Sequence, residues 1–281
     1  MGHSLLIRMT MKKFLLPLLA VLTVPAFAAS INIDNISKDD LKKVGNEFAM
    51  NFSHTTVAAP ETDGLWGVEV GALGGKTGSP NLKDVVNNAG GSGNDFKTLY
   101  HAAAFARVHI PFDLFAEATI LPKRDISDVS VSSNSFGVGW NVGAFLGLPI
   151  DIAVGYNTSS SDISFDQTIN NTSTSNTDVD STIKVATKSQ VAWVGVSKTF
   201  LFITPYVKVG NSHSDSQFKI DTNGAAGTVF AFTNRQKEDV SANGGFLATG
   251  ANIQLAFFKI GAEFSQTARV KRASAKISID F

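Results

Sequence analysis

The sequence predicts an all-β protein, a closed antiparallel transmembrane β-barrel of about ten strands (8–12), preceded by an N-terminal helical plug. Three observations predict it: long segments alternate with a period of two, their connections alternate between short and long, and an export signal precedes them. Only 17 % of the 281 residues are charged, yet no apolar run is long enough for a helical membrane span.

An export signal lies near the start of the chain. Lys12 and Lys13 precede an apolar run at 14–24, which leads into Pro25-Ala26-Phe27-Ala28. A basic start, an apolar core of about 7–15 residues and small residues before the cleavage point are typical of a secretory signal peptide. We therefore expect cleavage after Ala28 and assign 1–28 to an upstream extension followed by the signal peptide.

The next segment, 29–64, is predicted to be a helical plug. Residues 34–53 are expected to form its helix, with Asp34 or Ser37 as the N-cap. One apolar face follows from spacings of three and four residues. We expect this face to pack inside or beneath the barrel, and its residues are Leu41, Val44, Phe48 and Phe52.

From Leu65 the pattern changes to period two, and 65–281 is assigned to the barrel. Short turns at one end and long loops at the other are typical of a barrel with turns in the periplasm and loops outside the cell. The short connections are 110–113, 147–150, 200–202 and 256–257, and the longer ones are 76–96, 123–133, 166–181 and 221–235. The predicted strands are 66–72, 97–110, 114–122, 135–146, 151–165, 182–199, 203–220, 236–255, 257–269 and 271–281.

An exported sheet with one apolar face must bury that face against a second sheet or against lipid. The opposite face carries Gly, Ser, Asn and scattered charge, which suits a narrow wet lumen; a soluble β-sandwich is the alternative. In lipid every backbone amide must be paired, so the sheet must close. We expect interface aromatics on the apolar face, and these are Trp66, Tyr100, Trp140, Tyr156 and Trp193.

The last residues alternate strictly and place Ile277, Ile279 and Phe281 on one face. Together with the signal peptide and the strand pattern, this resembles bacterial outer-membrane β-barrel proteins, whose C-terminal strand is read by the barrel-assembly machinery. The resemblance implies a location in the bacterial outer membrane. It also implies membrane lipid and that machinery as partners.

A second resemblance concerns the segment before the first strand. A helical N-terminal segment, here 35–60, ahead of a barrel that ends on Phe is similar to the FadL-like hydrophobic-compound transporters. In that family the N-terminal part forms a hatch in the lumen. This chain lacks an Asn-Pro-Ala hatch motif, and ten strands are fewer than that family uses. OmpW-like barrels are similar in size but lack a long leading helix.

Charge gathers on the predicted inward face. Glu69, Arg107, Glu117 and Glu263 lie a few residues from the turn ends of neighbouring strands. We expect Arg107 to bridge these carboxylates, either as an ion-pair network that fills the barrel or as a constriction that selects solutes. The other residues predicted to face the lumen are His101, His109, Asn141, Lys184 and Lys188.

Catalytic and metal chemistry are not expected. His101 and His109 are eight residues apart on one strand, about 26 Å, which is too far to share a metal. The chain has no cysteine, and its zero net charge gives no sign of a nucleic-acid surface. His213 lies between two serines but lacks a recognisable nucleophile setting. No cofactor is expected, and an outer-membrane enzyme is the third alternative.

The leading functional prediction is passive, plug-gated passage of small solutes, including hydrophobic ones, through a narrow lumen or a lateral opening. No nucleotide-binding motif occurs, so we expect no energy coupling. The alternative is a non-transporting structural, adhesive or receptor barrel. Such a barrel would bind a partner through outer loops 76–96, 166–181 and 221–235.

Overall fold

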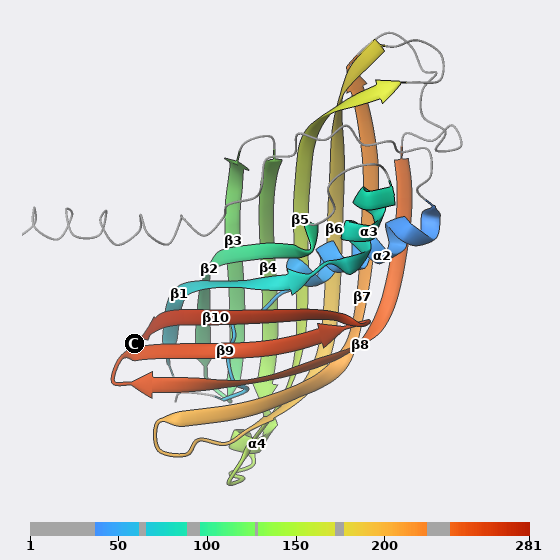
Figure 1. Cartoon of the computed structure of the whole chain (residues 1–281). Helices are drawn as coiled ribbons and strands as arrows, with labels where there is room; N and C mark the ends of the chain where they lie inside the picture. Colours follow the sequence, from blue (N-terminus) through green and yellow to red (C-terminus); the bar gives the residue numbers. More distant parts are fainter. Residues whose placement is uncertain (1–36, 62–65, 89–95, 127–128, 172–176, 224–236) are drawn as a thin grey trace, which may run out of the picture.

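Ten strands form one closed barrel, in which each strand pairs antiparallel with the next and β1 pairs with β10 (Figure 1). The predicted fold class is therefore confirmed. The computed structural model describes residues 37–61, 66–88, 96–126, 129–171, 177–223 and 237–281, so the export signal expected at 1–28 lies outside the described residues. The strands are β1 (Val68–Gly78), β2 (Thr98–Ile110), β3 (Leu114–Ile126), β4 (Val129–Asn141), β5 (Asp151–Asn171), β6 (Thr177–Ser197), β7 (Ile203–Asn223), β8 (Lys237–Leu255), β9 (Phe258–Thr267) and β10 (Val270–Asp280).

The strands differ greatly in length. β5, β6 and β7 have 21 residues each, about 70 Å at 3.3 Å per residue, whereas β9 has 10 and β10 has 11. A bilayer core needs only about 9–11 residues per strand. The loop ends of β3–β8 therefore rise beyond the membrane, and we call them the raised wall.

The raised wall corrects the predicted loops. Residues expected in the loops 123–133, 166–181 and 221–235 are partly strand, because β3–β7 continue into them as paired strands, with a register shift in β3 between Leu121 and Arg124. Their Ser, Thr and Asp content indicated loops, but a strand surrounded by water needs no apolar outer face. The inner face is apolar instead, and its buried residues are Val131, Ile163, Val185, Phe218 and Val240.

The turn end follows the prediction except after β4. Residues 142–146 were expected to continue the strand, but Val142–Phe145 form a short helix, α4. Asn141 is its N-cap: its side chain accepts from the Ala144 N–H at 3.0 Å and donates to Asp151 Oδ1 at 2.7 Å. Asn141 therefore lies on the buried, inward face of β4, as predicted, and its side chain shapes the turn that follows.

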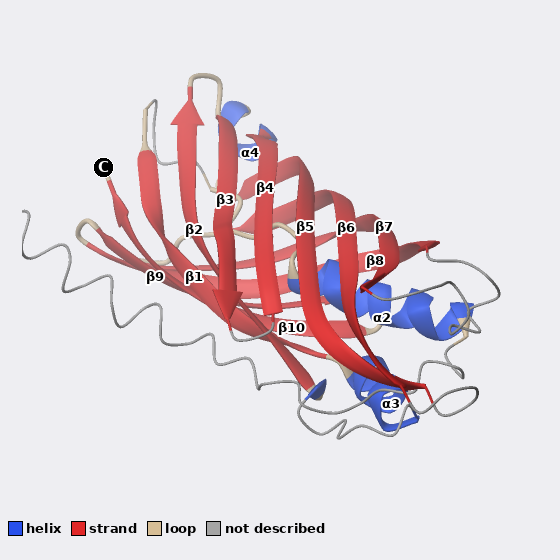
Figure 2. Ribbon diagram, turned by 90° about the horizontal axis from the view of Figure 1, so that it is seen from above, coloured by secondary structure: helices blue, strands red, loops and turns tan. Residues whose placement is uncertain are grey.

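Helix α2 (Lys38–Asn51) lies within the predicted range 34–53 and begins at Ser37, the N-cap of a capping box with Asp40. Seen from above, α2 passes inside the ring of strands (Figure 2). A second helix, α3 (Pro80–Asn88), occupies part of the predicted loop 76–96. Among the helices that the structure describes, none is long and apolar enough to cross a bilayer.

Candidate functional site

The candidate site is the lumen and the segment that runs through it, residues 38–61, which we call the insert. At the loop end, Lys38 pairs with Glu238 near the start of β8, at 2.5 Å. At the turn end, Glu61 lies 3.5 Å from the ammonium of Lys259, the second residue of β9. The insert therefore traverses the barrel lengthwise.

The upper half of the insert packs through apolar side chains. Leu41, Val44 and Phe48, predicted as the plug face, are buried against the inner face of the raised wall, and Phe52 packs beside them. Gly45 lies close to the wall, because a Cβ atom there would lie 3.0 Å from the Ser216 Cβ of β7. The position thus allows the helix backbone to lie against the wall.

Glu47 joins the two helices. Its carboxylate is fully buried and accepts from the backbone N–H groups of Asn81 at 2.8 Å and Leu82 at 2.9 Å, in the first turn of α3. Burial is the largest influence and raises the pKa of Glu47; hydrogen bonds from Asn81 and Leu82 oppose it, and Asp84 adds to it. Leu82 and Val85 of α3 extend the apolar cluster around α2.

The lower half of the insert is held by buried charge. Three of the predicted charges are direct cross-strand partners: Glu69 on β1 pairs with Arg107 on β2, and Arg107 pairs with Glu117 on β3. They lie close together, as the sequence predicted. Arg107 pairs with Glu117 at 3.4 Å and donates to the carbonyls of Ala59 at 2.8 Å and Glu61 at 2.7 Å. Its guanidinium thus binds insert backbone, which the sequence did not predict.

The carboxylates expected around Arg107 divide among several partners. Glu117 Oε2 lies 2.9 Å from His54 Nε2, whose Nδ1 is 2.6 Å from Ser135 Oγ. Glu263 accepts from the Thr55 hydroxyl at 3.0 Å and from the Tyr206 hydroxyl at 3.0 Å. Two of the four predicted charges therefore hold insert side chains directly.

Glu69 belongs to a separate group at the turn end. Lys276 Nζ lies 2.5 Å from its Oε1, and the Ser278 hydroxyl donates to the same oxygen at 2.6 Å. Lys259 is 3.9 Å from Glu69 Oε2 and 3.2 Å from Asp280. Arg107 therefore does not bridge all the carboxylates, as predicted; they belong to several separate clusters. Two of these clusters, those of Glu117 and Glu263, contact side chains of the insert.

Arg272 holds the insert through several contacts, and the sequence did not predict this role. It is buried, and its Nη1 donates to the carbonyls of Met50 at 3.0 Å and Ser53 at 2.7 Å. Its Nη2 lies 3.7 Å from Glu263. The predicted last strand, 271–281, already contained Arg272, but no role in the lumen was predicted for it; β10 begins at Val270, directly after the turn Ala268-Arg269.

The predicted lumen histidines both face inward. His101 Nδ1 lies 3.1 Å from Asn51 Oδ1, and its Nε2 lies 3.0 Å from Ser274 Oγ. His109 contacts the ring of Phe115 edge-on, with centroids 6.5 Å apart. His101 therefore attaches the end of α2 to β2 and β10.

The prediction of which face of β6 points into the lumen is wrong. Lys184 and Lys188 are exposed, and the inward residues are the odd-numbered ones. Trp193, expected on the lipid face, is buried in the lumen, where it stacks on Phe115 at 6.3 Å and lies over Gly155. Residues 191–196 are apolar or small on both faces, so alternation alone could not orient this strand.

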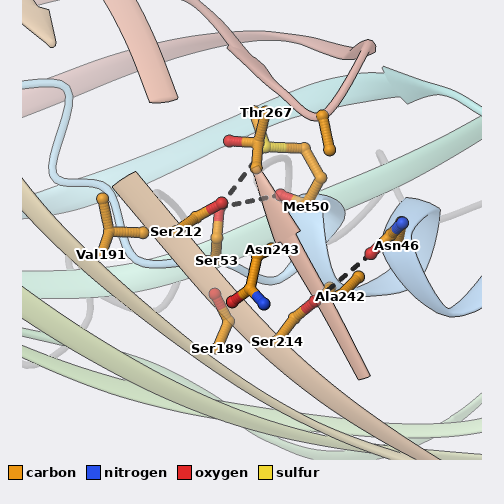
Figure 3. Close-up of a pocket in the computed structure, with 12 residues that line it drawn as sticks. Asn46, Met50, Ser53, Ser189, Val191, Ser212, Ser214, Ala242, Asn243 and Thr267 are labelled. Carbon is orange, nitrogen blue, oxygen red and sulfur yellow. Dashed lines mark hydrogen bonds between the residues drawn. The ribbon is translucent and has the colours of Figure 1, made fainter. Parts of the chain in front are cut away.

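Little free space separates the insert from the wall. A hollow beside α2 is lined by Asn46, Met50, Ser189, Ser212 and their neighbours and has a volume of about 10 Å³, enough for about one water (Figure 3). The Ser53 hydroxyl donates to the Met50 carbonyl at its edge, at 2.9 Å. The described part of the lumen is thus closely filled here.

A family model matches residues 19–281, and its description is "Family of unknown function (DUF6588)". The chain belongs to this family. Among curated proteins, none matches the DUF6588 chain.

Several solved structures resemble the DUF6588 chain. Ail of Yersinia pestis, in complex with the heparin analogue sucrose octasulfate, is 13% identical with a TM-score of 0.29, covering 77% of this chain and 97% of Ail. The translocator domain of autotransporter NalP from Neisseria meningitidis is 8% identical with a TM-score of 0.41, covering 78% and 90%. A TodX mutant, a monoaromatic hydrocarbon channel, is 9% identical with a TM-score of 0.33, covering 82% and 73%.

Proposed function

We propose that this protein lies in the bacterial outer membrane and passes small, predominantly apolar solutes along a route that the insert closes. Ile277 and Phe281 are exposed on the outer face of the final strand segment, consistent with the predicted assembly signal. The single observation that carries the passage proposal is the interrupted pairing between β2 and β3, which the insert covers.

The pairing stops halfway along β2. Within the described residues, β2–β3 pairs run only from Ile110↔Leu114 to Ala104↔Ile120, and the two strands diverge beyond that point (Figure 1). Asn51 of α2 donates to the carbonyl of Tyr100, in the part of β2 that β3 does not pair, at 3.1 Å. Because unpaired backbone is costly in lipid, a helix that supplies hydrogen bonds here acts as a removable seal.

The gap beyond the last β2–β3 pair, Ala104↔Ile120, is called the seam below. The region behind this seam is apolar. Leu99 from the unpaired part of β2 and Leu121 from the diverging part of β3 both join the cluster that contains Phe48 of α2. An apolar solute entering at the loop end would contact these side chains if α2 withdrew. It would then reach lipid through the seam without crossing the charged lower lumen.

The two halves of the insert are suited to different roles. The lower half is fixed by Arg107, Arg272 and Glu117, and removing one member of a buried charge pair costs several kcal/mol. The upper half is held by apolar contacts and by the hydrogen bonds of Glu47 and Asn51. We therefore expect α2 to move while 52–61 stays in place.

The test is uptake of an apolar fluorescent probe by proteoliposomes that contain the folded full chain. Asn51→Ala should raise uptake several-fold with little change in ionic conductance, because the seam opens while the lower lumen stays filled. Asn46→Ala is the matched control, since Asn46 lies on the same helix and accepts a hydrogen bond from the Ser214 hydroxyl of β7, at 3.3 Å. Unchanged uptake in a folded Asn51→Ala protein and in a deletion of residues 38–51 would sink the proposal.

A second candidate is a non-transporting barrel that binds a partner at its loop end. The filled lumen favours it, because carboxylates and guanidinium groups hold the lower half of the insert, and the hollow beside α2 has room for only about one water. This candidate predicts no uptake and no conductance with or without residues 38–51, and loss of partner binding when the loop end is trimmed.

A further inference from the structure

The apolar band on the outer face of β4–β6 is short. It occupies residues 136–140 of β4, 152–156 of β5 and 192–196 of β6, about 13 Å of each strand at 3.3 Å per residue. The next outward residue along each strand is polar, and these residues are Asn134, Thr158 and Gln190. The outward apolar side chains are Phe136, Val138, Trp140, Ile152, Val154, Tyr156, Ala192, Val194 and Val196.

A band of this height does not cover the lipid core. Outer-membrane barrels present an outward apolar band about 25 Å tall. On β2 the outward residues are apolar from Tyr100 to Ile110, about 33 Å along the strand, which is enough even for a tilted strand. On β4–β6 the strands alone therefore supply only about half of the height that the membrane requires.

The turns below these strands are also apolar. Helix α4 and the residues after it form the turn between β4 and β5, and α4 lies beyond the turn ends of both strands (Figure 1). Water-facing turns are usually built from Gly, Pro, Asn, Asp and Ser. Here the turn between β4 and β5 exposes Phe145, Leu146 and Leu148, and the turn between β6 and β7 exposes Phe200, Leu201 and Phe202.

Leu201 shows how unsuited these turns are to water. Its φ angle is 58°, in the left-handed region where Gly and Asn are favoured. Its side chain is 94% exposed, so packing against the protein does not explain why the residue is a leucine. A leucine at this position is unfavourable in water, both for its backbone and for its side chain. Both observations indicate that the turn lies in apolar surroundings.

The turn between β4 and β5 continues the band. The ring of Trp140, on the outer face of β4, contacts Phe145 of α4 edge-on, with centroids 5.4 Å apart. Asp151, at the start of β5, accepts from Asn141 at 2.7 Å, so its carboxylate already has a donor. Lys198 is exposed beside the other turn, with Nζ 5.8 Å from the ring centre of Phe200. Its long stem allows the ammonium to reach a headgroup from an apolar position.

We propose that the turns 142–150 and 198–203 lie within the phospholipid layer on the periplasmic side of the membrane and contact its acyl chains. The turns then complete the apolar band on the side of the barrel where the strands are too short. The inference rests on the outer-membrane location proposed above, but not on passage of a solute. It differs from the usual arrangement, in which such turns project into the periplasm.

The depth of single labels in a bilayer tests the proposal. The chain has no cysteine, so Leu146→Cys and Leu201→Cys can each carry one fluorescent label on the full chain. Val154→Cys, on the band, is the lipid control, and Asn134→Cys, beyond it, is the water control. The folded variants are placed in liposomes of phosphatidylethanolamine and phosphatidylglycerol. Quenching by lipids brominated on their acyl chains is compared with quenching by iodide in the water.

We expect the labels at 146 and 201 to be quenched by brominated lipid as strongly as the label at 154, and several-fold less by iodide than the label at 134. Quenching of both turn labels by iodide, as at 134, would overturn the proposal, because the turns would then be free to bind a soluble protein. Failure of brominated lipid to quench the label at 154 would instead overturn the membrane location itself, so the two failures are distinguishable.

Bilayer thickness provides a second test. The turn variant carries Leu146→Asn, Leu148→Asn and Leu201→Asn, and the matched control carries Thr158→Asn, Ser160→Asn and Gln190→Asn, which lie beyond the band. A shorter apolar band matches a thinner bilayer. We therefore expect the folding yield of the turn variant to fall several-fold in long-chain relative to short-chain phosphatidylcholine, and that of the control to follow the wild type. The same ratio in all three proteins would contradict the proposal.

Discussion

Arg272 donates to the carbonyl of Ser53 at 2.7 Å and lies 3.7 Å from the carboxylate of Glu263, so one guanidinium joins the final strand, the ninth strand and the insert. The carbonyl of Met50, the penultimate residue of α2, is a third partner at 3.0 Å. This contact fixes the point where the helix ends and the extended half of the insert begins.

Replacing this guanidinium should weaken the whole barrel. Arg272→Met removes the cation beside Glu263 and the donor to two carbonyls, and we expect a loss of about 3–5 kcal/mol in the free energy of unfolding. Heat-dependent gel mobility or thermal unfolding in detergent measures it. Arg269→Met, at an exposed turn position, is the control and should change little; equal effects of the two would contradict the role given to Arg272.

A side chain at position 45 should displace α2. The Cβ of Gly45→Val would lie 3.0 Å from Ser216 and 3.3 Å from a methyl group of Val240, so the helix must shift away from the wall. We expect faster proteolysis within 38–51 and an unchanged barrel core. Gly78→Ala is the control, since nothing lies within 4 Å of its added methyl group. Full protection of α2 in Gly45→Val would show that the contact is not restrictive.

The contact between α2 and α3 should depend on pH. Burial raises the pKa of Glu47 above its ordinary value, so ionising Glu47 costs more free energy in the folded protein than in the unfolded chain. The stability of this contact is therefore greater below the ordinary carboxyl pKa of about 4.3 and falls as pH rises through the raised value. Glu47→Gln should flatten this dependence, at the cost of one backbone acceptor. Thermal unfolding from about pH 4 to pH 7 measures both, and an identical slope in the two proteins would contradict the assignment.

Trp193 should act as a filler of the lumen. Trp193→Ala removes the ring that stacks on Phe115 and lies over Gly155, and we expect a cost of about 3–5 kcal/mol together with larger ionic leakage. Trp140→Ala removes an indole from the outer surface, where Nε1 donates to the Phe112 carbonyl at 3.1 Å, and should not raise leakage. Conductance in planar bilayers distinguishes the two variants. Leakage from Trp140→Ala but not from Trp193→Ala would contradict the placement of Trp193 in the lumen and Trp140 on the outer surface.

The sequence predicted the parts of this protein that depend on local pattern. Period-two alternation located ten strands, and spacings of three and four located the face of Leu41, Val44 and Phe48 on α2. The neighbouring positions of Glu69 and Arg107 followed from strand order. These properties arise from the backbone geometry of single elements and of adjacent strands.

The rest depends on contacts between distant residues. Arg107 and Arg272 bind carbonyls of Ala59 and Ser53, and a carbonyl has no signature in the side-chain pattern. The raised wall was missed because its outer face is polar, like a loop. Trp193 was placed on the wrong face because both faces of β6 are apolar or small at that height.

The passage of the insert through a closed ring has a consequence for the order of assembly. The ring closes where β1 pairs with β10, between Val70 and Ile279 for example, and a helix with its side chains is about 10–12 Å wide. A completed ring crowded by Arg272 and Trp193 offers no such opening. We therefore expect the insert, synthesised first, to be enclosed by strands that fold around it, so that β1–β10 pairing is the final and slowest step of biogenesis.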